Sequence, residues 1–331
     1  MYKLAKPIFL FCESPVHAGS GSDLGIVDLP IQRERHTGFP KIEGSGLKGG
    51  LRDAFERNEK LCFQERELEK EERQKSLSLV FGPDKGGEYA AALGLTDARV
   101  LLFPVRSVKG VYAWVTCPQV LERFKNDLLF AGINVVWDVP EVKSTPDGCS
   151  LYADQKRADE KRVEGKFAAE KEGKIILEEY TFDAGPDATC SQLASWLADA
   201  ILPAKPSFDY LRSKMKRDLL VLSDDDFRDF VQMSTEVVTR TKIDEKTGTV
   251  QKGALFTVEY LPAETVLYSL VLAAPVFNDQ KGLFTDGERA VLRFFRQNLP
   301  SIVQIGGDAT IGKGLVRLEG DLLEVKDHGE G

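Results

Sequence analysis

Three features of the sequence predict an α+β fold with a modified ferredoxin-like core. Strand-like and helix-like segments follow one another in the order strand, helix, strand, strand, helix, strand, with insertions between them. A segment late in the chain alternates between apolar and polar residues, turns and returns, as a long β-hairpin does. Hydrophobic residues make up 42% of the 331 residues, which is enough to build a sizeable core. This length suits one elaborated domain or two, and we expect a single elaborated domain over residues 1–331.

The first third of the chain begins with an apolar run that predicts a strand at residues 2–12. Residues 13–46 hold many Gly and Pro and predict a long loop system, which in a compact domain is usually functional. Leu47, Leu51 and Phe55 recur every four residues and predict a helix over residues 47–57, with Ser45 as its N-cap. Dense alternating charge at residues 61–80 is typical of a solvated helix, and a turn-rich connector follows it.

The later elements include two insertions, at about residues 61–90 and 138–174, and we expect the second to be peripheral and partly helical. The hairpin has strands at residues 236–243 and 249–260 around a turn at 244–248. The other predicted strands span residues 98–105, 111–116, 175–182, 266–273 and 315–325, and the other helices lie at 118–129, near 190–202 and 207–232, and at 283–298.

Composition excludes several classes of protein. No apolar run approaches the roughly 20 residues that a membrane span needs, so no membrane partner is expected, and the N-terminal run is expected to be a strand rather than a signal peptide. Five widely spaced cysteines without a CxxC pair indicate neither a zinc site nor a disulfide framework, which favours a reducing cytoplasm. The net charge of −8 taken alone argues against nucleic acid as a partner.

The segment from Asp28 to Gly49 departs from that acidic average. It combines a carboxylate, guanidinium groups, an imidazole and small residues ahead of a helix N-terminus. From Leu29 to Arg52 the chain has five basic side chains and two acidic ones. Guanidinium groups pair with phosphates in bidentate geometry, and a helix N-terminus adds free N–H groups. The segment therefore indicates a site for phosphate groups, although solvated charges on a surface loop would show the same composition.

Two glycine-rich segments accompany it. His17 to Asp23 can bring successive N–H groups close to a phosphate, although an ordinary tight turn explains this segment equally well. Gly306 to Gly314 fits GxxxxGK, but Gly314 stands where a P-loop needs Ser or Thr, and the segment leads into a strand rather than a helix. A nucleoside triphosphatase is thereby excluded, while contact with a nucleic acid backbone stays open.

Together these segments resemble the RAMP superfamily, and within it the repeating backbone subunit of the type III-B CRISPR effector, the Cmr complex. The stretch DLPIQRERHTGFPKIEGSGLKG at residues 28–49 carries the most specific likeness, and IGGDATIGKG at 305–314 resembles the glycine-rich loop of RAMP proteins. The hairpin at about 236–256 matches the family's thumb in position. The resemblance also implies an RRM-like RAMP core.

The resemblance implies an endoribonuclease that works inside an assembled complex. Copies would bind a CRISPR guide RNA head to tail, alongside other Cmr subunits. Each thumb would distort the duplex of guide and target RNA at regular intervals, and the target RNA would be cut there with a divalent metal, magnesium or manganese. Such a protein serves antiviral defence. The guide would supply sequence recognition, and the protein would read backbone and shape.

Site residues follow from the same likeness. The family's catalytic aspartate corresponds to Asp28, and His17, Glu259 and Tyr260 are further candidates near it. Asp28 would either accept the proton of the 2′-OH or hold a metal-bound water, and both roles stay open. Lys48 matches a guide-RNA contact. The other RNA-binding candidates are polar or basic residues of the same segments and of the hairpin: Arg33, Arg35, His36, Lys41, Ser45, Arg52, Arg240, Lys242 and Lys313.

Three other functions remain open at this point. The chain could be a guide-RNA-binding scaffold without catalysis, although a carboxylate beside RNA would then only repel phosphate. It could be a stand-alone ribonuclease that trims guide precursors with His17 and His36. It could also assemble into filaments without RNA, since head-to-tail contacts do not close.

Overall fold

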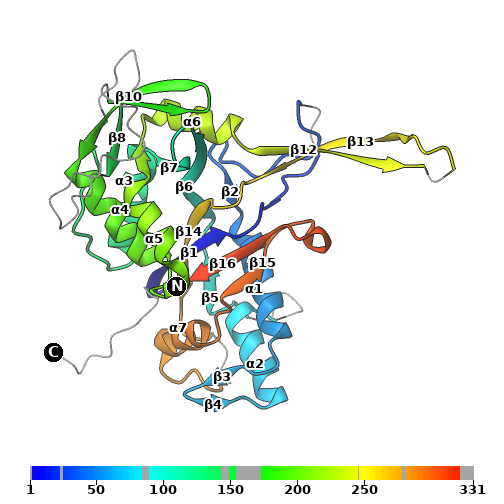
Figure 1. Ribbon diagram of the computed structural model, residues 1–331. Coiled ribbons are helices and arrows are strands. Elements are labelled where there is room, and N and C mark those ends of the chain that lie inside the picture. The colour runs from blue at the N-terminus through cyan, green and yellow to red at the C-terminus, as the bar shows by residue number, and fades with distance from the viewer. Residues whose placement is uncertain are drawn as a thin grey trace.

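A single large sheet organises the protein (Figure 1). The computed structural model describes residues 2–22, 25–83, 89–142, 149–153, 173–244, 246–277 and 281–320. Within these residues the sheet has twelve strands, and most neighbours are antiparallel; β7–β11 and β8–β10 are parallel pairs. The main path runs β15 (Ile302–Gln304), β16 (Leu315–Glu319), β1 (Leu4–Cys12), β14 (Val266–Ala273), β6 (Ala98–Ser107), β7 (Val111–Thr116), β11 (Leu219–Val221), β8 (Cys149–Ala153), β10 (Tyr180–Asp187) and β9 (Lys174–Leu177).

Two short strands join this path from the side, β2 (Lys41–Ile42) beside β6 and β5 (Leu93–Leu95) beside β14. At the far end the sheet curls, and β9 returns to touch β6 at the pair Leu177 and Ser107. The molecule is therefore a mixed α/β structure with a large, mainly antiparallel sheet.

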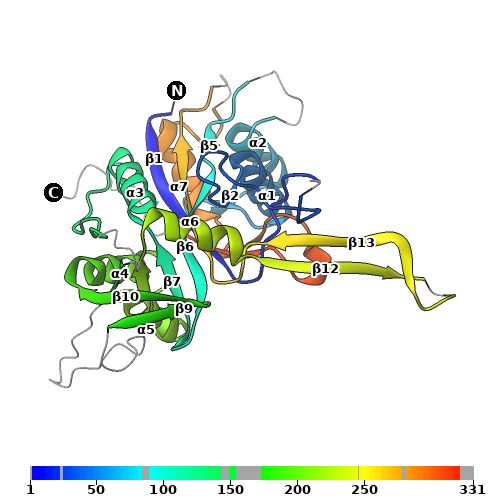
Figure 2. The same cartoon turned by 90° about the horizontal axis from the view of Figure 1, so that it is seen from above.

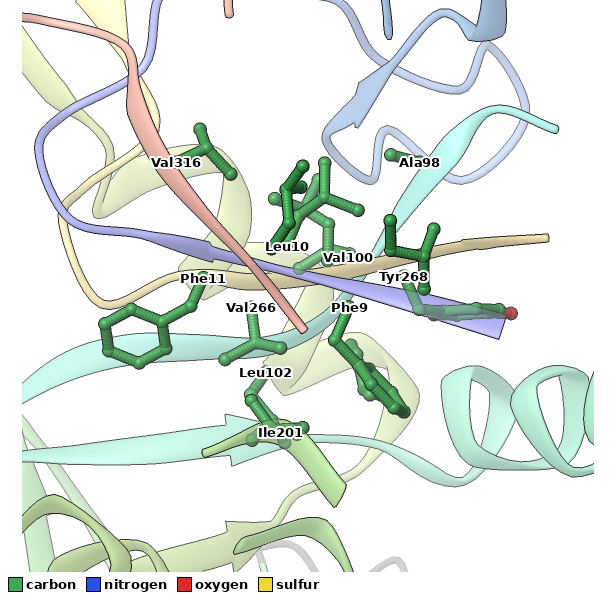
Figure 3. Close-up of a cluster of buried hydrophobic side chains, with 14 of the residues drawn as sticks. Phe9, Leu10, Phe11, Ala98, Val100, Leu102, Ile201, Val266, Tyr268 and Val316 are labelled. Atoms are coloured by element: carbon green, nitrogen blue, oxygen red, sulfur yellow. The ribbon is translucent and has the colours of Figure 1, made fainter. Parts of the chain in front are cut away.

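Strand β1 lies at the centre of the core. It pairs with β14 on one side and with β16 on the other. Ile8 to Phe11 are all at most 3% exposed, so side chains on both faces of this strand are covered. Figure 3 shows Leu10 on one face and Phe9 on the other, where Phe9 lies with Leu102 and Val266. This double burial explains why the first strand is a continuous apolar run rather than an alternating one.

Helices cover the sheet in two groups (Figures 1 and 2). One group packs around a cluster of phenylalanines in which Phe55 stacks on Phe295, with ring centres 5.5 Å apart. It contains α1 (Gly44–Arg57), α2 (Lys70–Phe81) and α7 (Gly287–Gln297), with the small hairpin β3 (Cys62–Phe63) and β4 (Arg66–Glu67). The other group contains α3 (Pro118–Phe130), α4 (Ala188–Ile201), α5 (Asp209–Arg217) and α6 (Asp224–Met233), and the 3₁₀ turns are η1 (Pro206–Phe208) and η2 (Ala309–Ile311).

A two-stranded hairpin projects from this body, as both cartoon views show. It pairs β12 (Glu236–Ile243) with β13 (Val250–Tyr260), and it forms a sheet of its own. Asp244 begins its turn by accepting the N–H groups of Lys246 and Thr247 at 3.0 and 2.9 Å. Gly248 ends the turn at a φ of 67°, a conformation that favours glycine. The predicted hairpin and its turn are confirmed.

The structure corrects the predicted helix at residues 207–232. It contains η1, α5, the strand β11 and then α6. Leu219–Val221 are wholly buried between β7 and β8, and short apolar runs do not distinguish a buried strand from a helix. The predicted strand at 175–182 is likewise two strands, β9 and β10, which pair antiparallel.

The prediction of a solvated helix at residues 61–80 was only partly correct. Its first part is the β3–β4 hairpin, and α2 begins at Lys70. Leu77, Val80 and Phe81 of α2 are buried, so the helix joins the core. Arg66 of β4 pairs with Glu72 of α2 at 2.8 Å, which joins the hairpin to the helix and is not the i,i+4 pair expected within one helix.

Of the insertion at 138–174, residues 143–148 and 154–172 lie outside the described residues. The backbone of β8 runs inside the sheet between β11 and β10, so this part of the segment is not peripheral. The last strand ends at Glu319, and residues 321–325 of the predicted strand lie outside the described part. Among the described residues, no helix is long and apolar enough to cross a membrane.

Candidate nuclease site at the hairpin base

The segment before β2 forms an extra extended stretch along the base of β13. Leu29 bridges Val258 in parallel; its N–H donates to the carbonyl of Thr257 and its own carbonyl accepts the N–H of Glu259, both at 3.0 Å. Ile31 then bridges Gly19, which joins the Asp28 stretch to the segment that begins at His17. The long loop predicted at 13–46 is therefore held against the hairpin, because its backbone groups find partners there.

Asp28 lies at the start of this stretch and is exposed. Its Oδ2 atom accepts two hydrogen bonds from Thr257, at 2.7 Å from the N–H and 2.8 Å from the hydroxyl. These bonds, the backbone one first, lower the pKa of Asp28 below its usual value. No hydrogen bond to its Oδ1 atom occurs among the described residues, so this oxygen is available to solvent or a ligand.

Glu259 is the opposite case. It is 5% exposed, and both carboxylate oxygens are occupied. Its Oε1 accepts from Arg33 at 2.5 Å and from the Thr235 hydroxyl at 2.8 Å, while its Oε2 accepts the N–H of Ile31 at 3.0 Å. Arg33 has further partners, since its Nη1 donates to the carbonyls of Gly38 and Val231, both at 2.9 Å. The ion pair between Arg33 and Glu259 therefore holds the loop that contains Arg33 against the base of the hairpin.

His17 lies beside the base of β13. Its Nδ1 is 2.7 Å from the carbonyl oxygen of Glu259. Because a carbonyl only accepts, Nδ1 carries the proton, and Nε2 is left as the acceptor in the neutral ring. The ring meets Tyr260 edge-on with centres 5.6 Å apart. A Cβ on Gly306 would stand 2.2 Å from the His17 carbonyl oxygen, so only glycine permits this close approach of the glycine-rich loop.

A second polar cluster joins the hairpin to that loop. Arg240 of β12 makes a two-armed ion pair with Asp308, with both contacts at 2.9 Å. The buried Tyr260 donates to the same carboxylate at 2.7 Å. Burial, together with the bond to Asp308, raises the pKa of Tyr260 to about 12, so at neutral pH Tyr260 is a hydrogen-bond donor and not a base. Burial alone would raise the pKa of Asp308, but the bonds from Arg240 and Tyr260 outweigh it and lower that pKa.

The structure separates the RNA-binding candidates into free and occupied groups. Arg35, His36 and Lys242 are exposed, and within the described residues no hydrogen bond to their side chains occurs. Ser45 is exposed as well. Four further candidates are engaged: Lys41 with Glu43 and Asp97 at 2.6 and 2.8 Å, Arg52 with Glu56 at 2.7 Å, Lys48 with the Leu93 carbonyl at 2.8 Å, and Lys313 over the Tyr260 ring at 5.0 Å. Burial, with Arg52 nearby, lowers the pKa of Lys48.

Ser45 is not the N-cap of α1, which corrects the prediction. Glu43 occupies that position without a side-chain bond, and the carboxylate of Asp97 accepts the Gly44 N–H at 2.9 Å instead. The cap comes from a residue more than fifty positions away, which local spacing does not show. At least one of the free N–H groups at the N-terminus of α1 therefore already has a partner within the protein.

Two site residues were not expected from the sequence, Thr257 and Asp308. Thr257 gave no signal, because an alternating threonine is ordinary in a strand. Asp308 offered a weak one, since it follows two glycines in the sequence. The structure gives it a φ of 65°, a conformation that Asp tolerates better than most residues. The glycine-rich loop contains η2 and leads into β16, so the prediction that a strand follows it is confirmed.

Known proteins share this architecture. A relative from Pyrococcus furiosus, named CRISPR system Cmr endoribonuclease Cmr4, is 38% identical over 329 residues, covering 97% of this chain and 96% of the relative. The crystal structure of oligomeric Cmr4 from the same organism matches with a TM-score of 0.67 and 30% identity, over 96% of this chain and 98% of that one. A cryo-EM structure of the type III-B Cmr-beta complex bound to cognate target RNA shares the fold, with a TM-score of 0.67 and 22% identity over 96% and 97% of the two chains.

The sequence model of the RAMP superfamily matches residues 10–317, which include the Asp28 stretch, the hairpin and the glycine-rich loop. A match of this extent, with a relative 38% identical over nearly the whole chain, identifies the family. The chain therefore belongs to the RAMP superfamily.

Proposed function

We propose that this protein is a backbone subunit of a type III-B CRISPR effector that binds guide RNA and cuts the target RNA paired with it, with Asp28 at the point of cutting. The observation that carries this proposal is the exposed Asp28 carboxylate, held at the base of the projecting hairpin with one oxygen available. The 38% identical relative named an endoribonuclease supports the same activity. Target RNA, guide RNA, further copies of the chain and other Cmr subunits are the proposed partners.

RNA brings its own nucleophile, the 2′-OH, so the protein mainly has to position it. Cleavage needs the 2′-OH in line with the scissile bond, and a regular duplex prevents this geometry. We infer that the hairpin is the family's thumb and opens the duplex beside Asp28. Leu255 and Phe256 support this role, because they are 62% and 36% exposed on a hairpin that forms a separate two-stranded sheet. Apolar side chains in such a position suit contact with bases, and positioning is a large term in catalysis.

The role of Asp28 follows from its hydrogen bonds. Its lowered pKa keeps the carboxylate ionised at neutral pH, as either proposed role requires. A general base works best when its pKa lies near the working pH, and the shift moves Asp28 away from that value. The balance favours an ionised group that orients a cation or a water molecule through Oδ1 over a strong base.

A divalent metal fits this site only in a particular way. Among the described residues no group of three or more His, Cys, Asp and Glu side chains could hold a metal ion. Magnesium is commonly held by one or two carboxylates together with substrate phosphates and water, and Oδ1 of Asp28 meets that requirement. When bound, magnesium or manganese would supply stabilisation of charge on the phosphate. The protein's own part is to present one fixed, ionised oxygen.

RNA binding would use the free cations first. Arg35 and Lys242 are exposed cations that can meet phosphates, and His36 lies 4.0 Å from Glu34, whereas Arg33 and Arg240 would have to leave Glu259 and Asp308. We also infer a ferredoxin-like core within the large sheet and one elaborated domain. The oligomeric crystal form of the relative supports head-to-tail self-association. Free, buried thiols such as Cys12 and Cys117 suit a reducing cytoplasm.

One observation favours a second candidate, a guide-binding scaffold without catalysis. Glu259 and Tyr260 are occupied by structural partners, and His17 is tied to a carbonyl through Nδ1. Within the part of the chain that the structure describes, no hydrogen bond joins Asp28 to another acid or base. The two candidates differ only in whether Asp28 is needed for cutting.

The deciding experiment measures single-turnover cleavage of target RNA by the assembled guide-bound complex with Mg²⁺ or Mn²⁺, and RNA binding in parallel. Asp28→Asn keeps the shape and removes the charge, and we expect cleavage to fall by about a hundredfold or more while binding is retained. Asp183→Asn, which changes an exposed aspartate on β10, is the matched control and should cut normally. Wild-type cleavage by Asp28→Asn would leave the scaffold as the better description.

A further inference from the structure

Thr257 makes a reciprocal set of hydrogen bonds with Asp28. Its N–H and its hydroxyl both donate to Oδ2, at 2.7 and 2.8 Å, and its hydroxyl oxygen accepts the N–H of Asp28 at 2.9 Å. A hydroxyl has one proton and two lone pairs, so one threonine side chain can serve both directions at once. Backbone and side chain of Asp28 are thus held by a single residue of β13.

This arrangement decides where the carboxylate points. Because Oδ2 is held from two sides, the carboxylate cannot rotate freely, and Oδ1 keeps one direction relative to β13. Leu29 continues the attachment through its bridge to Val258, and the Ile31 N–H bond to Glu259 completes it. The Asp28 stretch therefore moves with the base of the hairpin rather than as a loose loop.

We propose that Thr257 is a positioning residue that fixes Asp28 to the hairpin strand and so keeps the cleaving carboxylate in register with the base step that the hairpin opens. The inference rests on the proposed function, since it concerns how Asp28 is aimed. Thr257 itself need not touch RNA. Its hydroxyl is the part that matters, because the backbone N–H bond would survive most substitutions.

The test compares Thr257→Val with Thr257→Ser in the guide-bound complex. Valine keeps the branched shape that suits a strand and removes the hydroxyl, whereas serine keeps the hydroxyl. For Thr257→Val we expect single-turnover cleavage to fall about tenfold, as expected for loss of a hydrogen bond to a charged group, with RNA binding unchanged. We also expect cuts to spread to neighbouring phosphates. Thr257→Ser should restore both the rate, to within about twofold, and the cut positions.

Thr181→Val is the matched control, because Thr181 is an exposed threonine on the remote strand β10. It should cut at the normal rate and positions. Wild-type rate and cut positions in Thr257→Val would overturn the inference. Loss of RNA binding in both Thr257→Val and Thr257→Ser would also overturn it, because the residue would then only support the structure.

A double variant separates this inference from the proposed function. If Thr257 acts through Asp28, adding Thr257→Val to Asp28→Asn should cost nothing more than Asp28→Asn alone. An additive loss would show that Thr257 acts by another route. If Asp28→Asn itself keeps cutting, the catalytic role of Asp28 fails and this inference fails with it. If Asp28→Asn is inactive and Thr257→Val is normal, only the inference about Thr257 fails.

Discussion

Two carboxylates lie at the base of β13, those of Asp28 and Glu259, and they differ in exposure and in hydrogen bonding. Asp28 is exposed, and one of its oxygens has no partner among the described residues, whereas Glu259 is 5% exposed and has both oxygens filled. Asp28 attaches to β13 from outside through Thr257, while Glu259 belongs to β13 and draws Arg33, Thr235 and Ile31 toward it. Asp28 can still accept a hydrogen bond or a cation from a ligand, whereas both oxygens of Glu259 accept bonds that hold the fold together.

The difference shows how to interpret the other charges around the hairpin. A buried carboxylate needs partners, because an unpaired buried charge is costly. An exposed carboxylate is solvated by water and needs no partner for stability. The fixed orientation of Asp28 is therefore better explained by function. Arg33 and Arg240 resemble Glu259 in being satisfied, and Arg35 resembles Asp28 in being available. Satisfied charges indicate structure, and oriented but available charges indicate function.

The largest effect on stability should come from Glu259. Replacing it with alanine leaves Arg33 without its anionic partner in a largely buried place, and we expect the free energy of unfolding to fall by about 3 kcal/mol. Chemical denaturation measures this value. Asp28→Asn is the comparison, and its free energy of unfolding should change far less, because Asp28 is exposed. Equal losses in the two variants would remove the distinction between them.

An intermediate effect is expected at Asp308, which locks the glycine-rich loop to the hairpin. Asp308→Asn keeps the shape but weakens the bonds from Arg240 and Tyr260, and should lower the free energy of unfolding by about 1.5 kcal/mol at pH 7. Because folding lowers the pKa of Asp308, its stabilisation is present above the unfolded pKa of about 4 and is lost as pH falls through the lower folded value.

The difference between wild type and Asp308→Asn should therefore stay constant from pH 5 to 8 and shrink below about pH 4. Urea denaturation at several pH values tests this. If the difference in free energy of unfolding grew as the pH fell, its sign would be wrong. An ionised Asp308 would then not be the group that holds the glycine-rich loop to the hairpin.

The smallest effect is expected from single free cations. Arg35→Ala should weaken RNA binding modestly and reduce the slope of log affinity against log salt by about 0.7–0.9, the value for one phosphate contact. The free energy of unfolding should not change. Arg33→Ala should behave in the reverse way, with a clear loss of stability. An unchanged salt slope for Arg35→Ala would place this arginine away from the RNA.

Local patterns predicted those elements whose causes are local. The face Leu47, Leu51, Phe55 is buried in α1 as its spacing indicates, and the Asp244–Gly248 turn forms through contacts with its own neighbours. The β3–β4 hairpin was missed because its two-residue strands are too short to show a periodic pattern. Strand β11 was missed because its three residues are decided by pairing with β7 and β8, which are distant in sequence. Ser45 looked like an N-cap only because Asp97 is remote in sequence.

By itself, the sequence determined the first strand, helix α1, the hairpin and the composition of the Asp28 stretch, along with the likeness to a known family. Only the tertiary structure decided which charged groups remain available. Asp28 and Thr257 are 229 positions apart, and Arg33 and Glu259 are 226 apart. A hydrogen bond depends on distances near 3 Å, and residue spacing carries no such distance between segments so far apart. For that reason Asp28 could be named from the sequence, whereas the threonine that aims it could not.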